Sequence, residues 1–107
     1  VVTLSVDQVL FKQAIHVGEL VTFLASVNHV GRTSMEVGIK VVAENIQQRS
    51  QRHTNSCYFT MVAFEDGKAV AVPPLALDTP DQQRRFRGAE MRKQLRIEMQ
   101  QRKDAIA

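Results

Sequence analysis

Two segments of this chain place an apolar residue at every second position. The first segment carries Val21, Phe23, Ala25 and Val27, and the second carries Met35, Val37, Ile39 and Val41. This alternation is typical of strands that have one strongly apolar face. Sequential strands of this kind need something to cover that face. We therefore expect an antiparallel sheet whose apolar side requires a cover, either from a partner or from another part of the protein.

Further strand and turn signals extend this sheet. We expect strands over residues 1–11, 19–27, 34–44, 56–64 and 69–72. Asp66-Gly67 is a strong hairpin signal before the last strand, and Pro73-Pro74 ends that strand because proline donates no hydrogen bond to a ladder. Residues 45–55 are polar and lack apolar periodicity, so we expect a loop there. The fourth strand is apolar toward both faces, which favours a central position.

The segment that starts at Thr79 predicts a helix to about residue 103. Thr79 can cap this helix, Pro80 suits its first position, and Gln82 completes a capping box. Its apolar stripe is thin and consists of Phe86, Met91, Leu95 and Met99. A helix this polar gains little from burial, so we expect it to project or to lie across a neighbouring subunit. We accordingly divide the chain into a sheet domain, residues 1–77, and a C-terminal basic helix, residues 78–107.

The composition excludes several classes of protein. A length of 107 residues suits one small domain, and 44% hydrophobic with 23% charged residues argues against disorder. No apolar run approaches the length that crosses a bilayer, and the first residues do not resemble a signal peptide. The single cysteine, Cys57, cannot form an internal disulfide. We therefore expect a cytoplasmic protein without a membrane span.

The net charge of +3 comes from the C-terminal part. Residues 1–77 carry six basic and six acidic side chains, whereas residues 78–107 carry eight basic and five acidic ones. A basic helix can contact nucleic acid, but the interspersed carboxylates and scarce aromatic residues favour a solvated surface. We expect no nucleic-acid partner. A subset of these cations reaching the phosphate of a small ligand is the simpler interpretation.

A polar elbow between the two alternating segments is the main candidate binding site. It concentrates Asn28, Gly31, Arg32, Thr33 and Ser34. One interpretation is a surface hairpin in which Gly31 supplies a positive φ. The other is a ligand site, in which Arg32 offers bidentate hydrogen bonds to phosphate while hydroxyl and backbone N–H groups hold a polar ligand arm. The residues of the elbow leave both interpretations open.

The other reactive residues give little indication of catalysis or metal binding. Cys57 and His53 lie four positions apart, but the apolar strand around Cys57 favours a small buried hydrophobe over a nucleophile. His16, His29 and His53 stand apart from other ligand types, so we expect no metal site. The sequence contains no Walker loop, GxGxxG, GxSxG or HExxH pattern.

The succession of several short motifs resembles one enzyme family. The motifs are Val1-Val2-Thr3-Leu4-Ser5-Val6-Asp7, Phe11, His16-Val17-Gly18-Glu19-Leu20-Val21, Gly31-Arg32-Thr33-Ser34-Met35-Glu36-Val37 and Val70-Ala71-Val72-Pro73-Pro74-Leu75. With the charged helix, they are similar to the acyl-CoA thioester hydrolases of the hotdog fold, both the bacterial type and the brain-type cytosolic hydrolase. Each motif alone is weak, but the likeness covers nearly the whole chain in order.

The resemblance implies an α+β hotdog fold, in which a curved antiparallel sheet wraps around a long central helix. It implies homodimers that assemble into trimers of dimers. The implied reaction is hydrolysis of acyl-CoA to a free fatty acid and CoA, without a separate cofactor. The elbow residues Asn28, Gly31, Arg32, Thr33 and Ser34 would then lie near the CoA moiety.

One departure from the family concerns catalysis. In the family, a first strand, a glycine-rich turn and the central helix with the catalytic acidic or amide residue come before the Val-Val-Thr strand. None of these precedes Val1 here, so we expect this chain to be the C-terminal part of such an enzyme. We assign no catalytic residue and expect the 107-residue chain alone to be inactive. The alternative is a non-catalytic, hotdog-like subunit that binds an acyl or CoA ligand.

Overall fold

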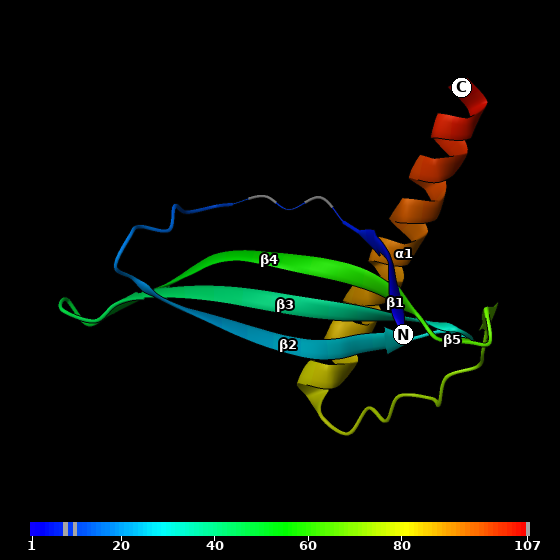
Figure 1. Cartoon of the computed structure of the whole chain (residues 1–107), viewed down its shortest axis with the longest axis horizontal. Coiled ribbons are helices and arrows are strands. Elements are labelled where there is room, and N and C mark those ends of the chain that lie inside the picture. The colour runs from blue at the N-terminus through cyan, green and yellow to red at the C-terminus, as the bar shows by residue number, and fades with distance from the viewer. Residues whose placement is uncertain (8, 10, 107) are drawn as a thin grey trace.

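Four antiparallel strands form the main sheet, in the order β1-β4-β3-β2. The computed structural model describes residues 1–7, 9 and 11–106. The strands of this sheet are β1 (Val2–Val6), β2 (Leu20–Val30), β3 (Ser34–Asn45) and β4 (Ser50–Val62). A small hairpin follows, made of β5 (Phe64–Glu65) and β6 (Lys68–Ala69), and then the helix α1 (Pro80–Ile106). Figure 1 shows α1 lying obliquely across the sheet and extending past its β4 side, which confirms the α+β class.

The two faces of the sheet differ as the alternation predicts. Val37 lies opposite Val27 on one side and Phe59 on the other, in an apolar row across three strands. The next residue, Gly38, belongs to the opposite face, where the first turns of α1 lie. Among the described residues no helix covers the apolar face, and 67% of Phe23 is exposed there. The expected need for a cover is therefore visible in the structure.

The predicted loop over residues 45–55 is wrong, because β4 begins at Ser50. β3 and β4 form one long hairpin whose ladder reaches Asn45 opposite Ser50. Arg49 adopts a left-handed φ of 53° in the turn between them. Backbone hydrogen bonds between strands do not require apolar side chains. Ser50, Gln51 and His53 at this end of β4 are exposed. Thr54 and Asn55 are buried, and Thr54 Oγ1 donates to Val41 O at 3.2 Å, so the strand forms without an apolar pattern.

An ion pair ties the segment before β2 to β4. Arg52 Nη1 donates to Glu19 Oε2 at 2.6 Å, and Arg52 Nη2 donates to Glu19 Oε1 at 2.9 Å and to Ala14 O at 2.6 Å. The backbone N–H of His16 donates to Glu19 Oε1 at 2.7 Å. The hydrogen bonds from Arg52 and His16 lower the pKa of Glu19 to about 2. We call this arrangement of Glu19 and Arg52 the clasp.

The first strand is shorter than expected. β1 ends at Val6 rather than near residue 11, and Gln8 and Leu10 of the expected strand lie outside the described residues. The backbone N–H of Lys12 still donates to Thr54 O at 3.0 Å. The N–H of Asp7 also donates to Tyr58 O at 3.0 Å, so separate hydrogen bonds rather than a continued ladder join this segment to β4.

The last strand is also shorter than expected. The prediction covered residues 69–72, whereas β6 pairs only Lys68 and Ala69 with β5. Beyond β6, the N–H groups of Val70 and Val72 donate to the carbonyl oxygens of Ala63 and Arg32, each at 2.9 Å. These two hydrogen bonds go to two different segments, so they attach residues 70–72 to the rest of the protein without forming a strand.

The helix begins as its capping signals predict. Thr79 Oγ1 accepts the N–H of Gln82 at 3.1 Å, and Gln82 Oε1 accepts the N–H of Thr79 at 3.0 Å, which makes a capping box. The helix ends at Ile106 rather than near residue 103. Ala89 is its buried residue, whereas Met91, Leu95 and Met99 of the expected apolar stripe are exposed. The prediction of light burial is confirmed.

Candidate substrate-binding site

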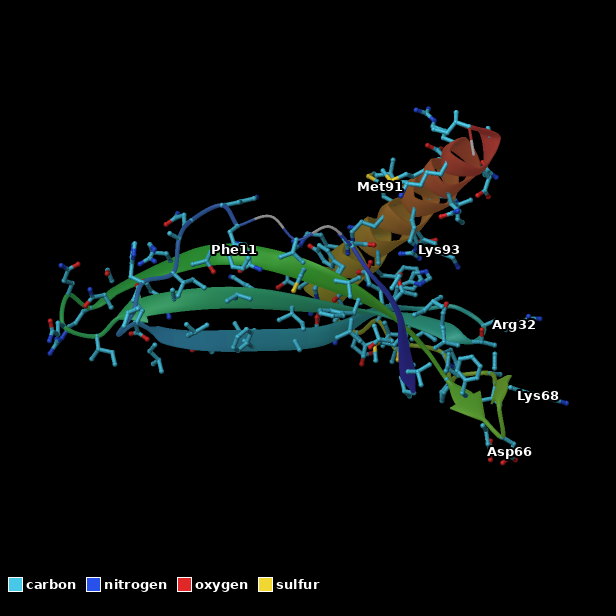
Figure 2. All side chains as sticks on the ribbon, turned by 45° about the horizontal axis from the view of Figure 1, so that its top comes forward. Phe11, Arg32, Asp66, Lys68, Met91 and Lys93 are labelled. Carbon is cyan, nitrogen blue, oxygen red and sulfur yellow. The ribbon has the colours of Figure 1, made fainter. Side chains whose placement is uncertain are left out.

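Three backbone hydrogen bonds hold the elbow between β2 and β3. The N–H of Gly31 donates to Ser34 O at 2.8 Å and closes the turn. Residues 63 and 72, which follow β4, donate the other two, to Thr33 O at 3.0 Å and to Arg32 O at 2.9 Å. The backbone of the elbow is therefore preorganised. The side chain of Arg32 is exposed and points away from the sheet (Figure 2).

The interpretation of Gly31 as a positive-φ residue is wrong. The described glycines with a positive φ are Gly18 and Gly67. What Gly31 supplies is space, because a Cβ there would lie 3.3 Å from Ser34 Oγ and 3.6 Å from Lys93 Nζ. The glycine thus allows a hydroxyl and an ammonium group to approach the turn together.

Lys93 of α1 is the binding candidate that the sequence did not identify. It is half-buried and lines a small hollow together with Ser34, whereas Arg32 lies at the outer end of the same elbow (Figure 2). The run of cations in the helix was a signal that one of them reaches a ligand, but not which one. A guanidinium, an ammonium and two hydroxyls in one region are groups that bind phosphate well.

Asn28 does not lie in the turn itself. The ladder pairs Val27 with residue 37 and His29 with Glu36, so Asn28 is the extra residue of a β-bulge. Its side chain accepts a hydrogen bond from Ser26 Oγ at 2.7 Å and donates to Glu36 Oε1 at 3.2 Å. With 4% of its surface exposed, Asn28 is buried. The structure brings residues 31–34 together and places Asn28 apart from them.

A buried ion pair joins α1 to β3 close to the elbow. Arg92 donates twice to Glu36, from Nε to Oε2 at 3.0 Å and from Nη2 to Oε1 at 2.7 Å. The Arg92 guanidinium also lies 3.7 Å from the centre of the Tyr58 ring, and its hydrogen bonds with Glu36 raise the pKa of Arg92. Six residues earlier in α1, Phe86 stacks on His29 with ring centres 4.5 Å apart. Both oxygens of Glu36 are engaged, so this carboxylate is not a free general base.

Of the other reactive side chains, Cys57 lies where the sequence predicts, whereas His53 lies in β4 rather than in a loop. Cys57 is buried opposite Ile39, which confirms it as a small core residue. His53 Nε2 lies 2.9 Å from Ser56 Oγ and 3.0 Å from Asn55 O. In the described part of the chain, no group of three or more His, Cys, Asp or Glu side chains is placed to hold a metal ion. No helix among the described residues is long and apolar enough to cross a membrane.

The chain matches known thioesterases in sequence and in structure. Residues 1–50 match the family model described as Thioesterase superfamily. The acyl-CoA hydrolase of Staphylococcus aureus, solved with butyryl coenzyme A, coenzyme A and coenzyme A disulfide, superposes with a TM-score of 0.79 at 30% identity, over 99% of this chain and 68% of that chain. The chain belongs to the hotdog-fold acyl-CoA thioesterases. A hexameric acyl-CoA thioesterase gives a TM-score of 0.85 at 35% identity, over 92% of this chain and 64% of that chain.

This thioesterase-family chain spans only part of its relatives. Protein VdlD of Helicobacter pylori is 58% identical over 95 residues, which cover 89% of this chain and 55% of VdlD. The chain thus spans about half the length of that relative. The expected hotdog fold is confirmed for the part that the chain contains.

Proposed function

We propose that the protein hydrolyses acyl-CoA thioesters to a free fatty acid and CoA, and that the elbow in this chain holds the CoA moiety. The observation that carries the proposal is the preorganised elbow, whose backbone is held by three hydrogen bonds and whose rim presents Arg32 and Lys93. Water is the second substrate in this reaction, and we propose no separate cofactor. Family membership supports the reaction type.

The elbow residues contribute different groups to the proposed site. Arg32 contacts a phosphate of CoA, because a guanidinium offers fixed charge and paired donors. The hydroxyls of Thr33 and Ser34 contact the pantetheine or nucleotide arm, and Gly31 leaves room for that approach. We also place Asn28 near the CoA moiety, and its amide is hydrogen-bonded to Ser26 and Glu36 in this structure.

We assign the general base to none of the described residues. The carboxylate nearest to the elbow along β3 is Glu36, which is 7% exposed and bonded to Arg92. We therefore propose that the group that activates water comes from outside these 107 residues. The purified 107-residue polypeptide should then hydrolyse no acyl-CoA at enzymatic rates. Normal turnover by that polypeptide would contradict the assignment.

We further propose that the protein works as a homodimer and as a trimer of dimers in the cytoplasm. The uncovered apolar face of the sheet and the exposed Met91, Leu95 and Met99 are surfaces that a second copy can bury. A hexameric acyl-CoA thioesterase among the similar structures supports the number of subunits. Mass measured by light scattering tests it, and a strictly monomeric natural protein would contradict it.

The decisive experiment measures CoA binding by isothermal titration calorimetry. Arg32→Ala removes a charge-assisted contact of about 1.5–3 kcal/mol, so the Kd for CoA should rise at least about tenfold. Arg102→Ala, which removes an exposed cation from the distant end of α1, is the matched control and should leave Kd unchanged. An unchanged Kd for Arg32→Ala would move the site elsewhere. Tight CoA binding by the natural protein without hydrolysis would favour the non-catalytic acyl- or CoA-binding subunit instead.

A further inference from the structure

A second hollow lies on the helix-covered face of the sheet, away from residues 31–34 of the elbow. Its volume is about 700 Å³, and it is bounded by β2, β3, β4 and the first turns of α1. Two cross-strand rows form its floor. One row consists of Leu24, Lys40 and Ser56, and the other consists of Ser26, Gly38 and Tyr58. Three small residues, Ser26, Gly38 and Ser56, lie on this floor where the helix passes over the sheet.

The charge of this hollow is one-sided. Its lining includes Lys40, Arg84, Arg85 and Arg92, and it contains no Asp or Glu. Arg92 is neutralised by Glu36, and Arg84 reaches Asp81 only at 3.5 Å on the exposed side of the helix. In the part of the chain that the structure describes, no ion pair involves Lys40 or Arg85. Cations held around one hollow repel each other unless an anion lies between them.

The donors around the hollow suit phosphate oxygens. Arg85, which is half-buried on α1, and Lys40 on β3 offer charged N–H donors from the helix and from the sheet. On the floor, the Ser56 hydroxyl and the His53 imidazole lie within 2.9 Å of each other and offer further polar groups. Two unpaired cations favour a ligand with at least two negative charges.

We propose that this hollow is a second binding site, for a phosphate-bearing anion with at least two negative charges. It is separate from the turn at residues 31–34, since Lys40 lies six residues after Ser34 along β3, which is about 20 Å at the rise of a strand. Asn28, at the other end of the elbow, also lines the hollow. The same chemistry is present in free diphosphate and in the diphosphate of a nucleotide such as CoA. The assignment rests on the charge and shape of the hollow and does not depend on the proposed hydrolysis.

The test measures binding of inorganic pyrophosphate to the natural protein by calorimetry at low salt. Lys40→Gln and Arg85→Gln should each raise the Kd for pyrophosphate about tenfold, the effect of losing one charge-assisted hydrogen bond. Arg102→Gln, on the same helix but outside the hollow, should leave Kd unchanged, and circular dichroism should show every variant folded. The proposal would be overturned if the natural protein did not bind pyrophosphate, or if all three variants weakened pyrophosphate binding equally.

Two further measurements identify the source of the anion. If saturating CoA leaves the Kd for pyrophosphate unchanged, the hollow takes a free phosphate-bearing anion. If CoA displaces pyrophosphate and Lys40→Gln weakens CoA as well, the hollow takes the diphosphate of the CoA nucleotide. Arg32→Gln should weaken CoA without changing the Kd for pyrophosphate. A loss of pyrophosphate binding in Arg32→Gln that matches the loss in Lys40→Gln would contradict two separate sites.

Discussion

Replacement of Glu36 by Gln should show that an ion pair, rather than apolar packing, fixes α1 on the sheet. The side chains of Glu36 and Arg92 are 8% and 26% exposed, and two hydrogen bonds join them. Removing one partner of a buried pair costs about 3–5 kcal/mol. Because a quarter of Arg92 is in contact with water, we reduce this to about 2 kcal/mol. Ala89 is the buried residue of the helix, so apolar packing of α1 on the sheet offsets little of the stability lost with the ion pair.

Urea unfolding of the natural protein measures this loss. With a typical m-value of about 2 kcal/mol per molar urea, Glu36→Gln should lower the midpoint by about 1 M. Glu90→Gln is the control, because the exposed Glu90 carboxylate on α1 makes no ion pair among the described residues. This substitution should change the free energy of unfolding by less than about 0.5 kcal/mol. In the double variant with Arg92→Gln, the loss should be smaller than the sum of the two single losses. Equal midpoints for Glu36→Gln and Glu90→Gln would refute the reasoning.

Three further predictions concern the stability of the natural protein, read from its urea midpoint. Gly38→Ala should cost about 1–3 kcal/mol because the new Cβ would overlap the Asn28 amide, and an unchanged midpoint would contradict the packing described. Thr79→Ala should cost about 1 kcal/mol through loss of the capping hydrogen bond, and no loss would mean that the cap contributes nothing. Folding lowers the pKa of Glu19 from 4.5 to about 2, so this carboxylate adds stability above about pH 5 that is lost as the pH falls toward 2. Arg52→Gln should make the urea midpoint depend less on pH over this range. An unchanged slope of midpoint against pH would contradict the clasp.

Local signals in the sequence predicted those parts of the fold that depend on neighbouring residues. The capping box at Thr79 and the two-faced alternation around Val37 are both present in the structure. The polar half of β4 was not predicted as a strand, because it forms by pairing with β3 and the polarity of its side chains does not indicate that pairing. A left-handed Arg49 in the turn left no sign in the sequence either, since Gly, Asn and Asp are the residues usually associated with that conformation.

In the candidate site, too, the features that depend on tertiary contacts could not be predicted from the sequence. The elbow at residues 31–34 was recognisable because its polar residues are contiguous between two strands. The position of Lys93 beside it depends on how α1 crosses the sheet, and that crossing is set by the contact of Arg92 with Glu36, far apart in sequence. The burial of Asn28 depends on a bulge, and nothing in the alternation marks which residue is the extra one. Tertiary contacts therefore decide which polar residues face a ligand.

The bulge at Asn28 also bears on how this strand can change its length during evolution. Beyond the extra residue, His29 faces α1 and Val30 lies opposite Met35. Deletion of the extra residue would leave Val27 opposite Val37 and His29 opposite Glu36, so the faces would be kept, but the buried hydrogen bonds of Asn28 with Ser26 and Glu36 would be lost. A deletion in β2 therefore disturbs the structure more than a deletion in the turn at residues 46–49, where the sheet ends. Homologues that keep the elbow should tolerate length changes at that distant turn and preserve the residue count between Val27 and Arg32.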